Sequence, residues 1–253
     1  MDRFIIEYVF FSDEKCDILV KYIFQKEVSM EFGRNKITIV CGHYGSGKTN
    51  VAVNLALQYK RMRPETDVAL ADVDIVNPYF RAADAREELT SAGVRPIIPA
   101  FANSNVDIPS LPPELYSLFR EDTNTVSFID VGGDDGAVAL GMYAEQIQAV
   151  GYDMLYVVSC YRPLTEKPEE AADLMRIIED ASHLRCTGIV NNSSIGAETT
   201  EEEIRASLPY AHACAAACGI PLCFTSYYEA LLPGLKIPGE ILFPMKNVTK
   251  QMF

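Results

Sequence analysis

Short apolar runs alternate with longer amphipathic segments along most of the chain. The runs are rich in valine, isoleucine and other strand-forming residues, as buried parallel strands are. They predict strands at 37–41, 67–72, 94–98, 126–129, 154–160, 186–191 and 221–225. Apolar residues at helical spacing predict helices at 50–62, 80–91, 109–120, 137–150, 167–181 and 200–218. Strands separated by helices indicate a three-layer α/β fold, with a mostly parallel sheet and helices on both faces.

A glycine-rich octet connects the first predicted strand to the first predicted helix. It matches the phosphate-binding pattern G-x-x-x-x-G-K-[ST] and consists of Gly42, His43, Tyr44, Gly45, Ser46, Gly47, Lys48 and Thr49. In this context backbone N–H groups and the positive end of a helix dipole point at one place, which suits a nucleoside triphosphate. Lys48 would neutralise the β- and γ-phosphates, and the Thr49 hydroxyl would bind Mg²⁺. The octet therefore predicts a P-loop NTPase fold that binds ATP or a similar nucleotide.

Aspartates follow two of the other predicted strands. Asp72 ends the second strand and Asp74 follows it, while Asp130 ends the fourth, one residue before the glycine-rich stretch 132–136. Because ligands of parallel α/β sheets bind at the carboxyl ends of strands, we expect these side chains beside the P-loop. We assign Asp130, with Thr49, to a Mg²⁺ contact, and Asp74 to orienting the attacking water. For Asp72, a catalytic role remains open beside a helix cap or a solvated strand end.

The net charge argues against some classes of partner. The chain has 253 residues, a formal charge of −13 and scattered Lys and Arg residues, so electrostatic binding to nucleic acid or anionic lipid is disfavoured. No secretory signal and no apolar stretch of membrane-spanning length is visible, and 7 cysteines then indicate reduced thiols. We expect a cytoplasmic protein that does not bind membrane and for which nucleic acid is a disfavoured partner.

Residues 1–29 look like an addition to this fold. The stretch 30–253 is expected to form a single P-loop ATPase domain, and Met30 lies shortly before its first strand. One hypothesis is that translation starts at Met30 and that residues 1–29 come from a misassigned start. The other is an extra strand–helix unit packed on the edge of the sheet.

The motifs resemble those of the MinD/ParA branch of P-loop ATPases, of the deviant Walker A or SIMIBI class. This branch also contains the nitrogenase iron protein and ATPases of metallocentre maturation. The resemblance covers residues 36–232 and rests on the octet, the D-x-D pair of Asp72 and Asp74, and the strand ends at Asp130 and Asn191. It implies a Mg²⁺-dependent ATPase that forms a nucleotide-dependent homodimer. It also implies that Asp74 positions the hydrolytic water and that Asn191 contacts the adenine.

The base is expected to be adenine rather than guanine. The guanine-selecting motif N-K-x-D is absent, because Asn191 is followed by Asn192, Ser193 and Ser194. A carboxamide such as that of Asn191 can pair with the adenine amino group and a ring nitrogen together. ATP is therefore favoured over GTP.

Two features depart from that family. The family carries a second P-loop lysine that reaches the phosphates of the partner subunit, and His43 stands at the matching position. Histidine is shorter and often neutral at pH 7, so either His43 acts more weakly or an arginine such as Arg81 or Arg162 supplies the charge. The loop after the fourth strand lacks the family's usual proline and carries Asp134 and Asp135, which suggests contacts with a partner protein.

These features favour an ATPase that switches loop conformation and dimerisation and thereby acts on an unidentified partner protein. An accessory or maturation ATPase for a metabolic enzyme is the nearest analogy. One alternative is a small-molecule kinase or ATP-dependent ligase on the same scaffold, with a metabolite near 77–81 and 134–135. Another is a positioning or partition ATPase, which would need to bind DNA or lipid.

Overall fold

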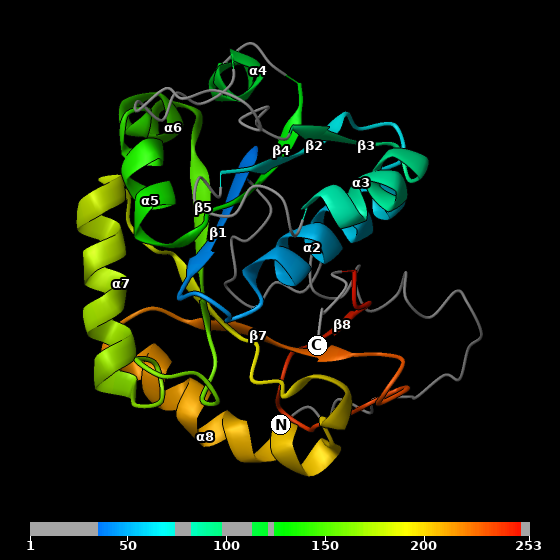
Figure 1. The fold of residues 1–253 in the computed structure, drawn as a ribbon, viewed down its shortest axis with the longest axis vertical. Coiled ribbons are helices and arrows are strands. Elements are labelled where there is room, and N and C mark those ends of the chain that lie inside the picture. Colours follow the sequence, from blue (N-terminus) through cyan, green and yellow to red (C-terminus); the bar gives the residue numbers. More distant parts are fainter. Residues whose placement is uncertain (1–34, 74–81, 98–112, 121–123, 249–253) are drawn as a thin grey trace, which may run out of the picture.

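The computed structural model describes residues 35–73, 82–97, 113–120 and 124–248. At its centre is a sheet of 8 strands in the order β3-β2-β4-β1-β5-β6-β7-β8, and every neighbouring pair is parallel (Figure 1). The strands are β1 (Ile37–Gly42), β2 (Val68–Asp72), β3 (Val94–Ile97), β4 (Val126–Asp130), β5 (Tyr152–Val158), β6 (Gly188–Asn191), β7 (Leu222–Tyr228) and β8 (Leu242–Met245). The strand that leads into the P-loop, β1, is therefore central, with β4 on one side and β5 on the other.

Helices cover both faces of this sheet (Figure 1). One face carries α2 (Lys48–Met62) and α3 (Ala82–Ser91), and the other carries α5 (Gly133–Gly141), α7 (Pro168–Ser182) and α8 (Glu201–Cys218). The shorter elements are α4 (Pro113–Tyr116), α6 (Ala144–Val150), η2 (Ser117–Phe119) and η3 (Gly196–Glu198). The predicted three-layer α/β fold with a parallel sheet is confirmed.

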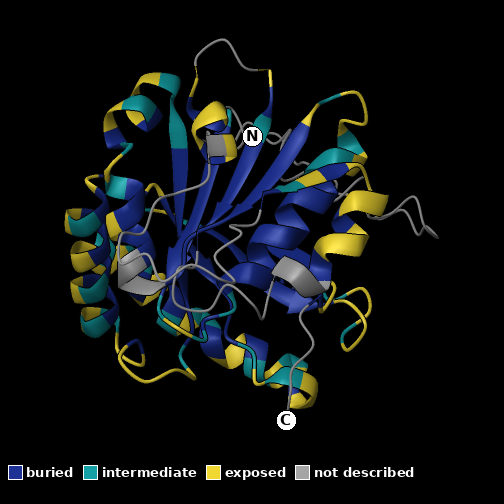
Figure 2. Cartoon of the chain, turned by 45° about the horizontal axis from the view of Figure 1, so that its top comes forward, coloured by how far each residue is buried: buried dark blue, intermediate teal, exposed yellow. Residues whose placement is uncertain are grey.

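Side chains along each strand alternate between two apolar cores. In β1, Ile39 and Cys41 pack toward α5, α7 and α8, whereas Val40 packs toward α2. In β6, Ile189 and Val190 likewise belong to opposite cores. Figure 2 shows that the strands are buried almost throughout, while exposed residues lie on the outer sides of the helices and on the loops. The position of a residue within its strand thus decides which face of the sheet it reaches.

The segment after β4 differs from the prediction. The sequence predicts a loop at 132–136 and one helix at 137–150, whereas the structure has two helices, and α5 starts directly after β4. Gly136 permits this early start, because a Cβ there would lie 2.8 Å from the carbonyl oxygen of Val73, the residue that follows β2. Gly141, the last residue of α5, lies similarly close to α7, since a Cβ there would be 2.7 Å from the carbonyl oxygen of Ala181. The chain turns after Gly141, where α5 lies close to α7, and α6 then begins at Ala144.

The last strand, β8, is missing from the prediction. It contains Pro244, which argues against a strand in the sequence but is tolerated on the edge of a sheet. Side chains of α2 bind its backbone: Gln58 Nε2 donates to the carbonyl oxygen of Pro244 at 2.7 Å. Asn54 both accepts from the backbone N–H of Lys246 at 2.8 Å and donates to its carbonyl oxygen at 2.9 Å. A polar stripe on the P-loop helix therefore holds the edge strand and its continuation.

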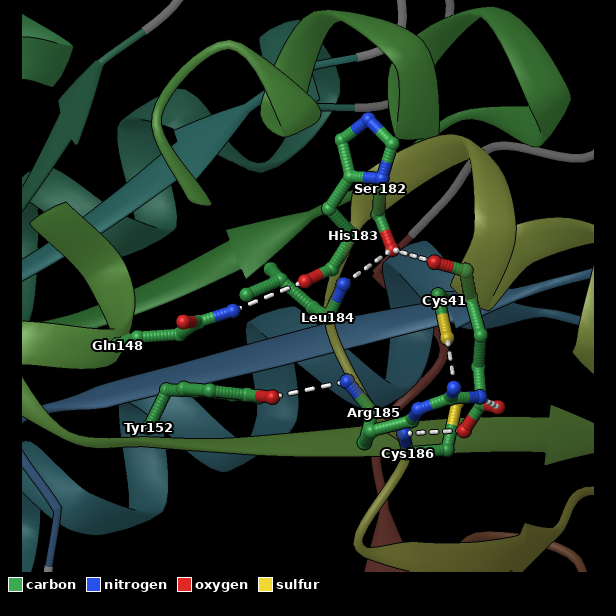
Figure 3. Close-up of polar contacts among 9 residues, drawn as sticks. Cys41, Gln148, Tyr152, Ser182, His183, Leu184, Arg185 and Cys186 are labelled. Atoms are coloured by element: carbon green, nitrogen blue, oxygen red, sulfur yellow. Dashed lines mark hydrogen bonds and ion pairs between the residues drawn. The ribbon is translucent and has the colours of Figure 1, made fainter. Parts of the chain in front are cut away.

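The connection from α7 into β6 is fixed by several polar contacts (Figure 3). The backbone N–H of Arg185 donates to the hydroxyl of Tyr152 at 2.8 Å, and the backbone N–H of Cys186 donates to Glu179 Oε1 at 2.8 Å. The sulfur of Cys186 lies 3.9 Å from that of Cys41 in β1 (Figure 3). These contacts set where β6 starts, and hence which residues at its carboxyl end face the P-loop.

Some predictions fall outside the described residues. The extension at 1–29 and the extent of the domain at 30–253 stay predictions for this reason. Of the helix predicted at 109–120, the described part forms α4 and η2. Among the described residues, none of the helices combines the length and the apolar composition needed to span a membrane.

Candidate functional site

The P-loop leaves β1 and enters α2 through two positions that only glycine fits. Gly42 has a φ of +145°, and a Cβ there would lie 2.5 Å from the carbonyl oxygen of Val157 in β5. Gly47 has a φ of +83°, and a Cβ there would overlap Nδ2 of Asn192. The loop thus lies tightly between the ends of β5 and β6, which fixes its path before α2 begins.

The start of α2 offers hydrogen-bond donors that no side chain caps. Gly47 at the N-cap makes no side-chain cap bond and the first turn carries no acidic residue, unlike α8, which has a capping box. Ser46 Oγ is buried without a hydrogen-bond partner in the part of the chain that the structure describes. Lys48 is only 3% exposed, and its Nζ donates to the carbonyl oxygen of His43 at 3.2 Å. Helix N–H groups, a hydroxyl and an ammonium group around one loop suit a chain of phosphates.

A hydroxyl and two carboxylates lie beside this loop. Thr49 Oγ1 donates to Asp130 Oδ2 at 2.6 Å, and both residues are buried. Asp72 at the end of β2 is the register partner of Asp130 at the end of β4, and it is buried too. Such oxygen donors fit Mg²⁺, which keeps several waters and needs only one or two carboxylates beside the phosphates.

Thr49 and Asp130 would therefore hold the ion together with the nucleotide. Among the described residues there is no group of three or more His, Cys, Asp or Glu side chains that could hold a metal. When bound, Mg²⁺ would neutralise charge on the phosphate oxygens. The assignment of Thr49 and Asp130 to the metal stays a prediction.

Asn192 holds the P-loop from the side of β6 and is absent from the predicted site. Its Nδ2 donates to the carbonyl oxygen of Ser46 at 2.6 Å, and its Oδ1 accepts from the hydroxyl of Ser226 in β7 at 2.6 Å. Both ends of the carboxamide are thus fixed, and the residue is buried. The alternation along β6, in which Val190 packs toward α2, is the signal that places Asn192 on the P-loop side.

The neighbouring Asn191 faces α8 instead. Its Nδ2 donates to Ser207 Oγ at 2.9 Å and to Thr225 Oγ1 at 3.3 Å, and its Oδ1 accepts from Ser193 Oγ at 2.7 Å. The residue is fully buried. A contact between Asn191 and adenine, as the family resemblance implies, would require at least one of these bonds to break, and it stays a prediction.

The other predicted site residues differ in where they lie, and two of them fall outside the described residues. Tyr44 is 61% exposed at the tip of the P-loop. Asp134 and Asp135 fall in the first turn of α5 rather than in a loop, because that helix begins at the residue before them. Asp74 and Arg81 lie outside the described residues, so the role of Asp74 in positioning water stays a prediction.

No family model and no curated protein matches the sequence. Among solved structures, the cell division protein FtsY from Thermotoga maritima matches with a TM-score of 0.51 at 18% identity, over 85% of this chain and 69% of that one. A ParA family ATPase from Chlorobium tepidum TLS matches with a TM-score of 0.47 at 15% identity, over 78% of this chain and 89% of that one.

The signal recognition particle receptor FtsY from Elizabethkingia anophelis matches with a TM-score of 0.45 at 18% identity over 84% of this chain. This chain spans 66% of that receptor, just under two thirds of its length. At these identities the likeness shows the fold alone. It rests on the Thermotoga maritima protein, whose TM-score exceeds 0.5. In its fold the chain thus matches a P-loop NTPase: a parallel α/β sheet with helices on both faces, whose strand β1 leads through residues 42–49 into α2.

Proposed function

We propose that the chain is a Mg²⁺-dependent ATPase that works as a nucleotide-dependent switch on a partner protein, as an accessory or maturation ATPase does. The observation that carries this proposal is the meeting of an uncapped helix start, the buried Lys48 and the Thr49–Asp130 pair at the end of β1. Phosphoryl transfer needs little from a protein beyond positioning and charge neutralisation. Lys48 would neutralise the β- and γ-phosphates, Thr49 and Asp130 would hold Mg²⁺, and Asp74 would orient the water.

The preference for ATP rests on Ser194. This residue stands where the guanine-selecting N-K-x-D motif has its aspartate. Guanine presents N–H donors that a carboxylate accepts, whereas the Ser194 hydroxyl lies 2.9 Å from Thr199 Oγ1 and accepts from the backbone N–H of Gly196 at 3.2 Å. With no carboxylate at this position, guanine has no advantage over adenine.

Exposed apolar side chains near the P-loop support a protein contact at this end of the molecule. They lie on the loops that follow β1, β5, β6 and β7, and their exposed fractions run from 36% to 64%: Tyr44, Tyr161, Leu164, Ile195 and Leu231. Apolar groups gathered on one side of a protein are typical of surfaces that bind other proteins. A second copy of the chain, in a nucleotide-dependent homodimer, is the first occupant that we propose. The partner protein would then recognise one state of this dimer.

Calorimetric titration with Mg²⁺ and ATP, GTP or ADP tests the binding, and size-exclusion chromatography with ADP or a non-hydrolysable ATP analogue tests the switch. We expect tighter binding of ATP than of GTP, and a dimer with the analogue only. Lys48→Ala should abolish binding, whereas Asp74→Ala should keep binding and lose turnover. If none of the three nucleotides gives heat, the proposal is wrong.

A further inference from the structure

The loop after β5 places an arginine against the P-loop. A Cβ built on Gly45 would lie 3.4 Å from Nε of Arg162 and 3.6 Å from its Nη1, so the guanidinium group lies next to the middle of the P-loop. Arg162 is exposed, and its guanidinium makes no hydrogen bond or ion pair with any residue that the structure describes. The group therefore lies beside the phosphate cradle with its donors available to a ligand.

Hydrogen bonds fix the loop that carries this arginine. Thr165, fully buried, donates its hydroxyl to the carbonyl oxygens of Ser159 at 3.0 Å and Arg162 at 3.2 Å. The hydroxyl of Tyr210 in α8 donates to the carbonyl oxygen of Thr165. Leu164 has a φ of +64°, an unfavourable conformation for leucine, although it is 64% exposed and packs little. The surrounding bonds hold this strained turn in place, as is typical of functional loops.

The neighbouring strands bring the two loops together. Gly42 at the end of β1 is the register partner of Val157 near the end of β5, so the loops that follow lie side by side. A guanidinium group is planar, always charged and able to bind phosphate through two hydrogen bonds. A guanidinium group beside the P-loop would therefore favour an anionic ligand there.

We propose that Arg162 binds the terminal phosphates of the nucleotide held by the P-loop of its own chain. This inference rests on the proposed function. Arg162 would supply from within one subunit the positive charge that the MinD/ParA family takes from a lysine of the partner subunit, and His43 would then be spared that role. The contact strengthens the binding of a triphosphate more than that of a diphosphate, because the triphosphate carries more charge at its end.

Calorimetric titration of Arg162→Ala with Mg²⁺ and either ADP or a non-hydrolysable ATP analogue tests the contact. We expect the affinity for the analogue to fall about tenfold to a hundredfold, as one lost charge-assisted hydrogen bond would do, and that for ADP by less than about threefold. Arg162→Lys should recover part of the loss, because it keeps the charge without the two-pronged geometry. Arg176→Ala, which removes another exposed arginine, one paired with Asp173 on α7, is the matched control and should change neither affinity.

A mixing experiment separates action within one chain from action across a dimer. Lys48→Ala keeps Arg162 but cannot bind nucleotide, whereas Arg162→Ala keeps its P-loop. We expect a mixture of the two to hydrolyse ATP no faster per Arg162→Ala chain than that variant alone. Recovery of turnover in the mixture would overturn the assignment to the same chain.

Three results of the binding experiment would each overturn either the contact of Arg162 with the terminal phosphates or the proposed function. Unchanged affinities in Arg162→Ala, or equal losses for both nucleotides, would overturn only the contact with the terminal phosphates. Failure of the unmodified protein to bind any nucleotide would instead overturn the proposed function. Arg162→Gln, checked by circular dichroism, gives the same comparison with a side chain closer in length should the alanine variant not fold.

Discussion

Asn192→Ala tests whether the protein holds the P-loop in its binding conformation before a nucleotide arrives. The side chain makes two hydrogen bonds of 2.6 Å, one to the carbonyl oxygen of Ser46 and one from the hydroxyl of Ser226. Each buried polar group left without its partner costs about 1–3 kcal/mol. The cost at Ser226 lies at the lower end of this range, because its hydroxyl also lies 3.2 Å from the carbonyl oxygen of Asn191 and can donate its hydrogen bond there instead. We therefore expect the free energy of unfolding to fall by about 2–4 kcal/mol.

Part of this loss should appear as weaker nucleotide binding, because Ser46 lies inside the P-loop. If the bond to its carbonyl oxygen stabilises the competent loop by about 1–2 kcal/mol, its removal lowers nucleotide affinity by a factor of about 5–30. Calorimetric titration with Mg²⁺ and ADP measures the affinity, and urea denaturation measures the stability. Asn192→Asp should weaken binding further than alanine, because it keeps the acceptor for Ser226 but turns a carboxylate oxygen toward the carbonyl of Ser46.

Asn54→Ala is the matched control for this experiment. Asn54 is also a buried asparagine that bonds backbone atoms. Two of its bonds, at 2.8 and 2.9 Å, hold Lys246 after β8, and a third, at 2.8 Å, goes to the carbonyl oxygen of Asn50 within α2, so none of the three holds the P-loop. We expect a similar loss of stability with less than about a threefold change in nucleotide affinity. If both variants lose affinity to the same extent, affinity follows overall stability and the reasoning about Asn192 is wrong.

Three further changes test other parts of the structure. Thr49→Val removes the 2.6 Å bond to Asp130 with little change of shape and should lower nucleotide affinity about tenfold or more in the presence of Mg²⁺ and far less in EDTA, as titrations in both buffers would show. Gly188→Ala should lower the free energy of unfolding by about 1–3 kcal/mol, because the new Cβ would overlap Cys223 Sγ, and Cys223→Ala in the same chain should recover most of that loss in urea denaturation. Burial raises the pKa of the Cys223 thiol from 9.0 to about 12, so the folded chain keeps a proton that the unfolded chain releases. Stability should therefore fall as the pH rises from 9.0 toward about 12, and urea denaturation across this range should show a smaller slope for Cys223→Ala.

Much of the sheet and the P-loop could be predicted because their signals are local. A buried parallel strand is a short apolar run, and residues 42–49 carry the whole phosphate-binding pattern within one segment. The approach of Asp130 to Thr49 also follows from the sequence, since parallel strands present their carboxyl ends at one edge of the sheet. The structure adds that β4 is the direct neighbour of β1, which brings these two side chains within 2.6 Å.

Features that depend on distant parts of the chain could not be predicted in this way. The strand β8 is held by side chains of α2, and the bond from Gln58 to Pro244 joins residues 186 positions apart. No local pattern at 242–245 contains that contact. The start of α5 depends in the same way on the close approach of Gly136 to the end of β2. Both errors arise because a packing partner, and not local propensity, decides where the element lies.

The two asparagines at the end of β6 show what an alternation rule adds to a motif. The family resemblance selects Asn191, but a motif does not state which of two adjacent and identical residues faces the phosphate-binding loop. The phase of the strand does: Ile189 packs toward α8 and Val190 toward α2, so Asn191 must face α8 and Asn192 the P-loop. The observed bonds, from Asn191 to Ser207 and from Asn192 to Ser46, follow this phase. To assign the two asparagines to the two faces of β6, one must know which face of the sheet α2 covers, and only the folded structure shows this. A residue's contribution to this site is therefore set jointly by the motif, which supplies the chemistry, and by the pleat of the strand, which directs it.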